Sequence, residues 1–405
     1  MKILVINSGS SSIKYKLFQM PERLAITSGS VEKIGEEGSH IKQTTVKSGQ
    51  DEEKTERQVD IPDHRTGLDN IAGLLTDESC GVITDPNEIF AVGHRVVHGG
   101  ERFSQPTLIN DEVLANIESL SFLAPLHNPA NLEGIKVSKE VFPQAKQVAI
   151  FDTAFHQSLP DYAYRYAIPN WLYDEHAVRA YGFHGTSHRY VARRAADLLE
   201  TSEENLNLIT IHLGNGCSMA AVKGGKSIDT SMGLSPLAGL VMGTRSGDID
   251  PSIYNFLESR LDMDFKAVDK MLNKESGLKG LTGENDLRAV IEHAESGDKN
   301  AQLALDVYTY RIKKYIGAYA AALGKLDAIV FTAGVGENSA LIREKVCTNL
   351  DVLGIHIDKE KNEASDRTER LINDSQSRVT ILVIPTNEEL EIADQTQQLL
   401  QHVNG

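Results

Sequence analysis

Near its start the chain reads Ile3-Leu-Val-Ile-Asn-Ser-Gly-Ser-Ser-Ser-Ile-Lys14, an apolar run that enters a glycine–serine turn, and a second run from Ile13 to Phe18 follows it. Apolar runs on both sides of a small-residue turn predict two strands joined by that turn. Such turns leave backbone N–H groups and hydroxyls available to surround an anion such as phosphate. An ordinary hairpin is the alternative interpretation, because Gly, Ser and Asn are common in hairpin turns.

A similar sequence occurs in the middle of the chain, Leu208-Ile-Thr-Ile-His-Leu-Gly-Asn-Gly-Cys-Ser218. When the two phrases are aligned without gaps, Gly9 falls on Gly214 and Ser10 falls on Asn215. The repetition favours function over two unrelated hairpins. It predicts a duplicated fold of two domains with a cleft between them and two facing anion-binding loops.

Length and charge restrict the classes of protein that fit. The 405 residues are too many for one ordinary core, which predicts two domains, and strands that alternate with helices predict the α/β class. A net charge of −16 and a pI near 5.3 argue against nucleic-acid binding and favour a cytoplasmic protein. The three cysteines Cys80, Cys217 and Cys347 are scattered, so they predict neither a zinc site nor a disulfide framework. No apolar run is long enough for a signal peptide or a membrane span.

Periodicity and breaker residues predict the elements along the chain. Strands are expected within 2–35 and at 89–97, 147–151, 207–213, 217–223, 327–333 and 379–384. Helices are expected at 65–76, 111–120, 130–141, 187–199, 251–260, 264–272, 285–296, 300–324 and 388–400. Ser187 is the predicted cap of the helix that runs to Leu199. Residues 36–60 are polar and predict an exposed hairpin or loop, and 224–250 predicts a long glycine-rich loop, which is usually functional.

Two arginines and one aspartate are placed where a ligand is expected. Arg95 interrupts an apolar strand and Arg245 lies in the glycine-rich loop, and a guanidinium suits carboxylate and phosphate groups. A structural ion pair is an equally good explanation for either arginine alone. Asp152 directly follows a strand, and ligands of α/β sheets bind beyond the carboxyl ends of strands.

Two histidines and two glutamates are further candidates for the ligand-binding site. His127 and His184 lie in turns rich in Pro or Gly, where a lone histidine is more often structural. Several histidines and arginines together would supply the positive charge that phosphoryl transfer needs. Glu388 and Glu389 begin the last helix, either to complement its dipole or to bind Mg²⁺.

Three familiar signatures are incomplete. Gly225-Lys-Ser227 resembles the end of a Walker A loop, but Ala220 stands where its first glycine belongs. Gly334-Val-Gly-Glu-Asn-Ser339 lacks the last glycine of a dinucleotide fingerprint, which argues against a Rossmann oxidoreductase. His184 and His188 have the spacing of a zinc protease pair, but no Glu stands next to the first histidine.

At this point the chain resembles the acetate kinase (acetokinase) family over essentially its whole length. The matching segments, all in the family's order, are Asn7-Ser-Gly-Ser-Ser-Ser-Ile-Lys14, Gly93-His-Arg-Val-Val-His-Gly-Gly100, Leu123-Ala-Pro-Leu-His-Asn-Pro129, Phe151-Asp-Thr-Ala-Phe-His156, Tyr181-Gly-Phe-His-Gly-Thr-Ser-His188, His212-Leu-Gly-Asn-Gly216, Asp229-Thr-Ser-Met-Gly233, Met242-Gly-Thr-Arg-Ser-Gly-Asp-Ile-Asp-Pro251, Phe331-Thr-Ala-Gly-Val-Gly-Glu-Asn338 and Asn387-Glu-Glu389. Two segments depart from the family pattern, Lys279-Gly-Leu-Thr-Gly-Glu-Asn285 and the pair Asp394-Gln395.

The resemblance implies the fold of the superfamily that includes acetate and sugar kinases, actin and heat-shock-chaperone ATPases, with two duplicated ribonuclease-H-like halves. It implies an N-terminal domain at 1–152, completed by the C-terminal helix at 387–405, and a nucleotide-binding domain at 153–386. It also implies a homodimer and the reversible reaction of ATP and acetate to ADP and acetyl phosphate.

The resemblance also implies roles for individual residues. Those implied to be catalytic are Arg95, His127, Asp152, His184 and Arg245. Those implied to bind the acetate are Arg95, Val97, Leu126, Phe183 and Pro236. Those implied to bind ATP are Ser10, Ser12, Lys14, His212, Leu213, Gly214, Asn215, Gly216, Asp286, Leu287, Arg288, Ala333, Gly334, Val335, Gly336, Glu337 and Asn338. Asn7 and Glu388 are implied to hold Mg²⁺, with Mn²⁺ as an alternative.

Two rival functions remain open from the sequence. A kinase for propionate or butyrate differs only in the acyl pocket, where one methylene changes discrimination by ~1–3 kcal/mol. An actin-like ATP-binding switch would use nucleotide binding itself as its output, and two arginines beside an apolar pocket argue against it.

Overall fold

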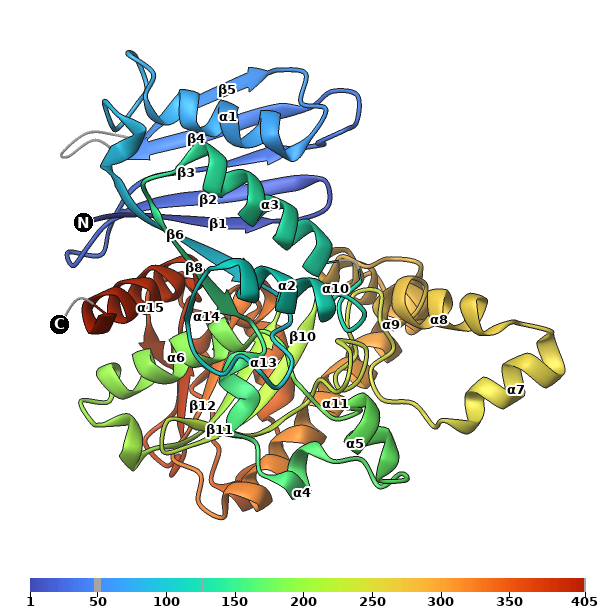
Figure 1. Ribbon diagram of the computed structural model, residues 1–405. Helices are drawn as coiled ribbons and strands as arrows, with labels where there is room; N and C mark the ends of the chain where they lie inside the picture. Colours follow the sequence, from blue (N-terminus) through green and yellow to red (C-terminus); the bar gives the residue numbers. More distant parts are fainter. Residues whose placement is uncertain (47–51, 126, 404–405) are drawn as a thin grey trace. The chain divides into compact units, whose positions relative to one another are not determined.

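The structure, a computed structural model, describes residues 1–46, 52–125 and 127–403 (Figure 1). Its internal contacts divide the chain into two compact units. Unit 1 consists of Met1–Ala154 and Asn387–Gly405, and unit 2 consists of Phe155–Thr386. Within the described residues, none of the helices combines the length and the apolar character that a membrane crossing requires.

Unit 1 is built on an eight-stranded sheet with the order β5-β4-β3-β2-β1-β6-β8-β7. The strands are β1 (Lys2–Ser8), β2 (Ser12–Gln19), β3 (Leu24–Glu32), β4 (His40–Val46), β5 (Glu52–Gln58), β6 (Ile89–Val96), β7 (Thr107–Leu108) and β8 (Lys146–Phe151). β1 pairs antiparallel with β2 and parallel with β6, and β6 pairs parallel with β8.

Helices cover both faces of the unit 1 sheet. They are α1 (His64–Leu75), α2 (Asp111–Ser119), α3 (Asn128–Val141) and α15 (Glu388–Val403). Successive side chains of a strand point to opposite faces, so Leu4 and Ile6 join the core formed with Leu68 of α1. Ile3 joins the core on the other face with Ile392 of α15. Burial on both faces explains why β1 reads as a continuous apolar run.

Unit 2 contains a six-stranded sheet with the order β11-β10-β9-β12-β14-β13. The strands are β9 (Asn207–Leu213), β10 (Cys217–Lys223), β11 (Lys226–Thr230), β12 (Ala328–Thr332), β13 (Arg370–Leu371) and β14 (Thr380–Val383). The helices are α4 (Asp161–Tyr164), α5 (Trp171–His176), α6 (Gly185–Leu198), α7 (Ser252–Leu261), α8 (Phe265–Lys274), α9 (Gly277–Thr282), α10 (Leu287–Glu295), α11 (Lys299–Leu323), α12 (Ala333–Asn338), α13 (Ala340–Cys347) and α14 (Lys359–Glu363).

Two helices pack on opposite faces of the unit 2 sheet. His188 of α6 lies at hydrogen-bond distance, 2.8 Å, from both Thr210 of β9 and Ser218 of β10. On the other face, the sulfur of Cys217 in β10 lies 3.3 Å from the hydroxyl oxygen of Tyr308 in α11. The sheet therefore lies between α6 and α11.

The two sheets share one five-stranded arrangement. β3-β2-β1-β6-β8 and β11-β10-β9-β12-β14 each join an antiparallel trio to two parallel strands. The gapless alignment of the two sequence stretches also places the first and last residues of β1 on the first and last residues of β9. The turns differ, because Ser8 pairs with Ile13 whereas Leu213 pairs with Cys217, one residue sooner. The predicted duplication and α/β class are thereby confirmed.

The predicted cap at Ser187 is wrong. α6 begins at Gly185, and His184 precedes it with a left-handed backbone, φ 56°. Ser187 lies inside the first turn, where its hydroxyl contacts Nδ1 of His212 at 2.8 Å and the hydroxyl of Thr386 at 2.9 Å. The side chain is thus occupied by tertiary partners and does not bond to its own helix.

The predicted loop at 224–250 contains a strand, whereas the segment at 36–60, predicted as an exposed hairpin or loop, contains an antiparallel pair of strands. Lys226–Thr230 within the glycine-rich segment forms β11, because Gly224 and Gly225 adopt positive φ and turn the chain back along β10. The polar 36–60 segment forms β4 and β5, which extend the unit 1 sheet as a pair. Residues 47–51 between them lie outside the described residues.

Candidate functional site

Three parallel strands of unit 1 bring Asn7, Arg95 and Asp152 to one edge of the sheet. Asn7 lies near the end of β1, Arg95 near the end of β6, and Asp152 follows β8. The pairing of Ile6 with His94 in β1 and β6, and of Val96 with Phe151 in β6 and β8, aligns these strand ends. Carboxyl ends of neighbouring strands are the usual ligand-binding edge of α/β sheets.

Two carboxylates share one guanidinium at this edge. Arg95 donates from Nη2 to Oδ2 of Asp152 at 3.0 Å, and its Nε lies 3.8 Å from Oε2 of Glu388 at the start of α15. The Asp152 side chain is 1% exposed and that of Arg95 is 19% exposed. Burial raises the pKa of Glu388 to about 7; Arg95 opposes this rise, while Asp152 and Glu389 add to it. Burial opposes the charge of Arg95, but the carboxylates more than offset it and raise the pKa of Arg95.

The first turn lies next to this edge. The backbone N–H of Gly9 donates to the carbonyl of Ser12 at 2.8 Å, and Nε2 of His64 donates to the carbonyl of Gly9 at 2.7 Å. Ser10 and Lys14 are exposed, and Ser12 is half-buried. The turn is therefore held by its backbone, and its side chains are left facing outward.

Two asparagines of α3 hold the ends of β1 and β6 together. Asn131 accepts from the N–H of Val97 at 3.0 Å and donates to the carbonyl of Ser8 at 2.7 Å. Asn128 accepts from the N–H of His98 at 3.0 Å. The sequence interpretation missed both asparagines, although Asn128 lies in a quoted family segment. His127 is exposed where α3 begins, and Leu126 lies outside the described residues.

The donor set at this edge fits a hard cation such as Mg²⁺. The side chains of Asn7, Asp152 and Glu388 offer oxygen atoms, and two carboxylates there exceed the charge of one arginine. In the described part of the chain, no three His, Cys, Asp or Glu side chains gather into a metal cluster. Few protein ligands suit Mg²⁺, which usually keeps several waters and binds substrate phosphates.

His184 of unit 2 is held firmly against the sheet. Its Nδ1 lies 2.8 Å from the hydroxyl of Ser218 in β10. Its ring stacks on the ring of His212 in β9, with centroids 4.2 Å apart and planes 18° apart. A left-handed backbone is uncommon for histidine, and such conformations often occur at functional sites.

His184 and Arg245 both lie over the second turn. A Cβ built on Gly216 would lie 3.4 Å from Nε2 of His184 and 3.7 Å from Nη1 of Arg245. Arg245 is half-buried and donates from Nη1 to the carbonyl of Pro236 at 3.2 Å. Among the described residues no carboxylate pairs with Arg245, and burial lowers its pKa. A half-buried guanidinium without a carboxylate is suited to an anionic ligand.

A pocket of about 960 Å³ in unit 2 gathers much of the predicted ATP-binding set. The predicted residues that line it are Gly214, Asn215, Asp286, Leu287, Arg288, Gly334, Val335 and Asn338. Asp286 caps α10 and pairs with Arg288, with Nη2 and Oδ2 2.6 Å apart. This volume suits a small-molecule ligand.

Other predicted ATP-binding residues of unit 2 do not line this pocket. They are His212, Leu213, Gly216, Ala333, Gly336 and Glu337. Leu213 is fully buried in the sheet, and Oε1 of Glu337 accepts from the N–H of Thr386 at 3.0 Å. Neither of these two side chains forms part of the pocket wall.

The structure adds pocket residues that the sequence interpretation missed. They are Gly243, Leu278, Asn285, Ile291, Glu292, Tyr308, Ser339 and Arg367. Gly243 could have been found from its place in the predicted glycine-rich loop, and in the structure a Cβ there would lie 2.3 Å from Oδ1 of Asn215. Most of the others come from helices α9, α10 and α11, whose sequences carry no motif.

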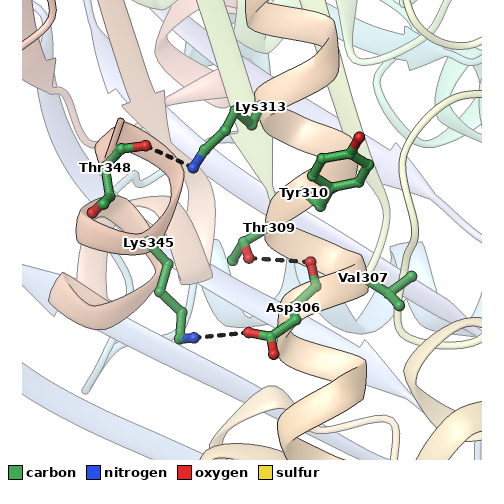
Figure 2. Close-up of a pocket in the computed structure, with 7 residues that line it drawn as sticks. All are labelled: Asp306, Val307, Thr309, Tyr310, Lys313, Lys345 and Thr348. Atoms are coloured by element: carbon green, nitrogen blue, oxygen red, sulfur yellow. Dashed lines mark hydrogen bonds and ion pairs between the residues drawn. The ribbon is translucent and has the colours of Figure 1, made fainter. Parts of the chain in front are cut away.

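A second, shallower pocket of about 500 Å³ lies between α11 and α13 (Figure 2). Its charged groups already have partners. Lys345 pairs with Asp306 at 2.9 Å, and Lys313 donates to the carbonyl of Thr348 at 2.6 Å. It is smaller than the other pocket and contains none of the predicted ATP-binding residues, so the larger pocket is the better candidate.

Comparison with known proteins agrees with this site. The model of the acetokinase family matches residues 2–394. Acetate kinase from Flavobacterium johnsoniae is 55% identical over 402 residues, which cover 99% of this chain and 100% of that protein. Acetate kinase from Sulfurovum is 52% identical and is covered completely. This chain belongs to the acetokinase family.

Solved structures of acetokinase-family enzymes share the whole fold. The crystal structure of Porphyromonas gingivalis acetate kinase matches with a TM-score of 0.93 at 46% identity, covering 98% of this chain and 99% of that one. A propionate kinase from Francisella tularensis matches with a TM-score of 0.90 at 44% identity, with the same coverage. The predicted actin-like ATPase fold with two duplicated α/β halves is thus confirmed.

Proposed function

We propose that this acetokinase-family chain catalyses the reversible transfer of the γ-phosphoryl group of ATP to acetate, giving ADP and acetyl phosphate. The observation that carries the proposal is Arg245, a half-buried guanidinium that pairs with no carboxylate of the described residues, beside His184 over Gly216. The same turn supplies Gly214 and Asn215 to the 960 Å³ pocket. Together these groups offer an adenosine site with positive charge at its phosphate end.

The reaction needs little help from a base. A carboxylate is ionised at neutral pH, so an acetate oxygen can form its bond to the γ-phosphorus while the bond to the bridging oxygen of ADP breaks. The electron pair of the broken bond stays with ADP, and no proton has to move. The main tasks are to position two anions and to neutralise their charge. Direct in-line transfer is the proposed course, and a phosphorylated Asp152 or Glu388 formed at the rate of turnover would contradict it.

In unit 2, His184 and Arg245 neutralise the transferring group. The phosphates lie along the turn formed by Gly214, Asn215 and Gly216, whose small side chains let an anion approach the backbone. The adenosine occupies the pocket lined by Asp286 and by the other residues of α10 and α12. Phe183 precedes His184 in the sequence, and the carbonyl of Pro236 accepts a hydrogen bond from Arg245. Both residues belong to the acetate methyl pocket.

In unit 1, Arg95 holds a carboxylate or phosphoryl oxygen, and Asp152 fixes its orientation through the 3.0 Å hydrogen bond. Val97 and His127 line the acetate side. Ser10, Ser12 and Lys14 bind phosphate at the first turn. Asn7 and Glu388, with Asp152 beside them, would hold Mg²⁺ or Mn²⁺, which screens the charge of the ATP phosphates when it is bound.

The test is an acyl phosphate assay with ATP and Mg²⁺ across acetate, propionate and butyrate. We expect the highest kcat/KM with acetate and a lower side activity with propionate. Propionate is a serious second candidate because the Francisella tularensis match is a propionate kinase. A higher kcat/KM with propionate would favour that function, and slow ATP hydrolysis independent of any acid would favour an actin-like switch.

We also propose that the chain works as a homodimer in the cytoplasm, where ATP is available. Helices α7 and α8 contact each other through the stacked rings of Tyr254 and Phe265, 6.2 Å apart. They expose the α7–α8 face, which consists of Ile253, Phe256, Leu261 and Phe265. Light scattering should show a dimer that Phe256→Glu weakens and that Tyr310→Glu, an exposed change on α11, does not. A wild-type monomer at micromolar concentration would contradict this proposal.

A further inference from the structure

One hydroxyl connects His184 to a second histidine. The hydroxyl oxygen of Ser218 lies 2.8 Å from Nδ1 of His184 and 2.8 Å from Nε2 of His188. Nδ1 of His188 in turn lies 2.8 Å from the hydroxyl of Thr210. A continuous row of hydrogen-bonding groups therefore runs from the interior of unit 2 to His184.

The secondary structure places these side chains together. His188 lies in the first turns of α6, and His184 immediately precedes that helix with a left-handed backbone that brings its ring to the same neighbour, Ser218. Ser218 lies opposite His212 in the β9–β10 register, on the sheet face that α6 covers. Ser218, His188 and Thr210 are all 0% exposed, so water does not compete for these hydrogen bonds.

The proton count couples the two imidazoles. A serine hydroxyl carries one proton, so Ser218 donates to one of the two nitrogens and must accept an N–H from the other ring. His188 lies in an apolar interior among three other histidines, which lowers its pKa well below its usual value and keeps it neutral. Of the two proton arrangements that this allows for a neutral His184, only the one in which Ser218 donates to Nδ1 leaves a proton on Nε2 to donate to a phosphoryl oxygen, so the proposed role requires that one tautomer.

The face of the His184 ring is also fixed. It stacks on His212, whose Nδ1 lies 2.8 Å from the hydroxyl of Ser187. Ser218 holds the edge of the ring and His212 holds its face, so Cε1 and Nε2 lie 3.3 and 3.4 Å from the position that a Cβ on Gly216 would occupy. That is the turn where the proposed mechanism places the phosphates.

We infer that Ser218, supported by His188, is a positioning residue that holds Nδ1 of His184 and directs Nε2 at the transferring phosphoryl group. This inference rests on the role proposed for His184. Ser218 does not touch the substrate, so its removal changes the chemical step and leaves ground-state binding largely intact.

The first test replaces the hydroxyl and separates kcat from KM. We expect Ser218→Ala to lower kcat by about 10–100-fold, the usual effect of losing a side chain that orients a catalytic group. The KM values for ATP and acetate should change less than about threefold. A kcat within twofold of wild type, or equal losses through both KM values, overturns the inference.

A matched pair distinguishes orientation from packing. Ser218→Thr keeps the hydroxyl and Ser218→Val replaces it with a methyl group in nearly the same volume, so the threonine variant should be at least about tenfold faster. Ser39→Ala is the control for a buried serine, because Ser39 is 3% exposed and also makes two hydrogen bonds, to Val59 and Ile61, far along the chain. Ser39→Ala should lower stability without lowering kcat. Equal rates of the threonine and valine variants overturn the inference.

A spectroscopic test examines the wild-type protein, and a variant is needed only to assign its signals. ¹⁵N spectra of histidine-labelled wild-type protein, assigned with His184→Asn, should show the His184 ring in a single tautomer, and a tautomer mixture in wild type overturns the inference. The outcome for His184 itself is separate. If His184→Asn retains normal kcat, the proposed role of His184 fails, whereas a slow His184→Asn beside a normal Ser218→Ala defeats the positioning role alone.

Discussion

Arg343 offers a quantitative test of what holds the nucleotide pocket in shape. This side chain of α13 is 1% exposed, and burial lowers its pKa to about 10, so it is charged at neutral pH. It donates to the carbonyls of Gly336 and Glu337 in α12, both at 2.9 Å, and to Oδ1 and the carbonyl of Asn362 at 2.7 and 2.8 Å. α12 carries pocket residues, including Val335, so Arg343 ties the pocket wall to the body of unit 2.

Arg343→Met removes four hydrogen bonds and leaves their acceptors in a dry interior. A hydrogen bond to a charged group contributes about 1.5–3 kcal/mol, and partial relaxation reduces the sum. We therefore expect a loss of about 3–5 kcal/mol in the free energy of unfolding, which is typical of breaking a buried charged network. For a domain of this size that corresponds to a fall in Tm of roughly 6–20 °C.

The assay is urea unfolding together with the KM for ATP. Arg102→Met is the control, because Arg102 is exposed and its loss should change stability by less than about 0.5 kcal/mol. The KM for ATP should rise several-fold in Arg343→Met and stay unchanged in the control. A loss below about 1 kcal/mol in Arg343→Met would refute the idea that these hydrogen bonds hold α12.

Three further predictions concern the proposed reaction and the fold. Arg95→Ala and Arg245→Ala should each lower kcat by ~10³-fold or more with unchanged circular dichroism, and near-normal turnover would remove that arginine from the mechanism. Gly216→Ala places a methyl group 3.3 Å from the His184 ring, so kcat should fall at least about tenfold while Tm changes little; normal kcat would show that this turn does not carry the phosphates. Burial lowers the pKa of His94 from 6.5 to about 4, so the stability it contributes is complete above pH 6.5 and is lost as pH falls from 6.5 to 4. Urea unfolding should therefore show about 2 kcal/mol less stability at pH 5 than at pH 7 from this group, and the loss should be smaller in His94→Gln.

Local sequence was enough to predict most of the strands and several of the residues at their ends. The apolar run of β1 and the small turn after it predicted a strand–turn–strand unit. The similar sequence at Leu208–Ser218 predicted the duplication that the sheet order confirms. Asp152 was recognised because a strand's end is visible in the chain itself, where an apolar run meets a polar residue. Arg95 was recognised because it interrupts an apolar strand, whereas the role of Asn7 came from the family resemblance. Their meeting at one edge follows from parallel pairing, which the α/β pattern already favours.

Only the tertiary structure decided which side chains support one another. Ser187 was predicted as a helix cap, yet it contacts His212 and Thr386, 25 and 199 positions away. The hydrogen-bond contact between Ser218 and His184 joins residues 34 positions apart, and the periodicity of α6 and β10 does not predict it. Periodicity determines which face of an element is buried, but packing determines which atoms meet there. The chain's sequence therefore specified the strands, the turns and the family, whereas the fold determined how His184 is oriented and which helices complete the pocket.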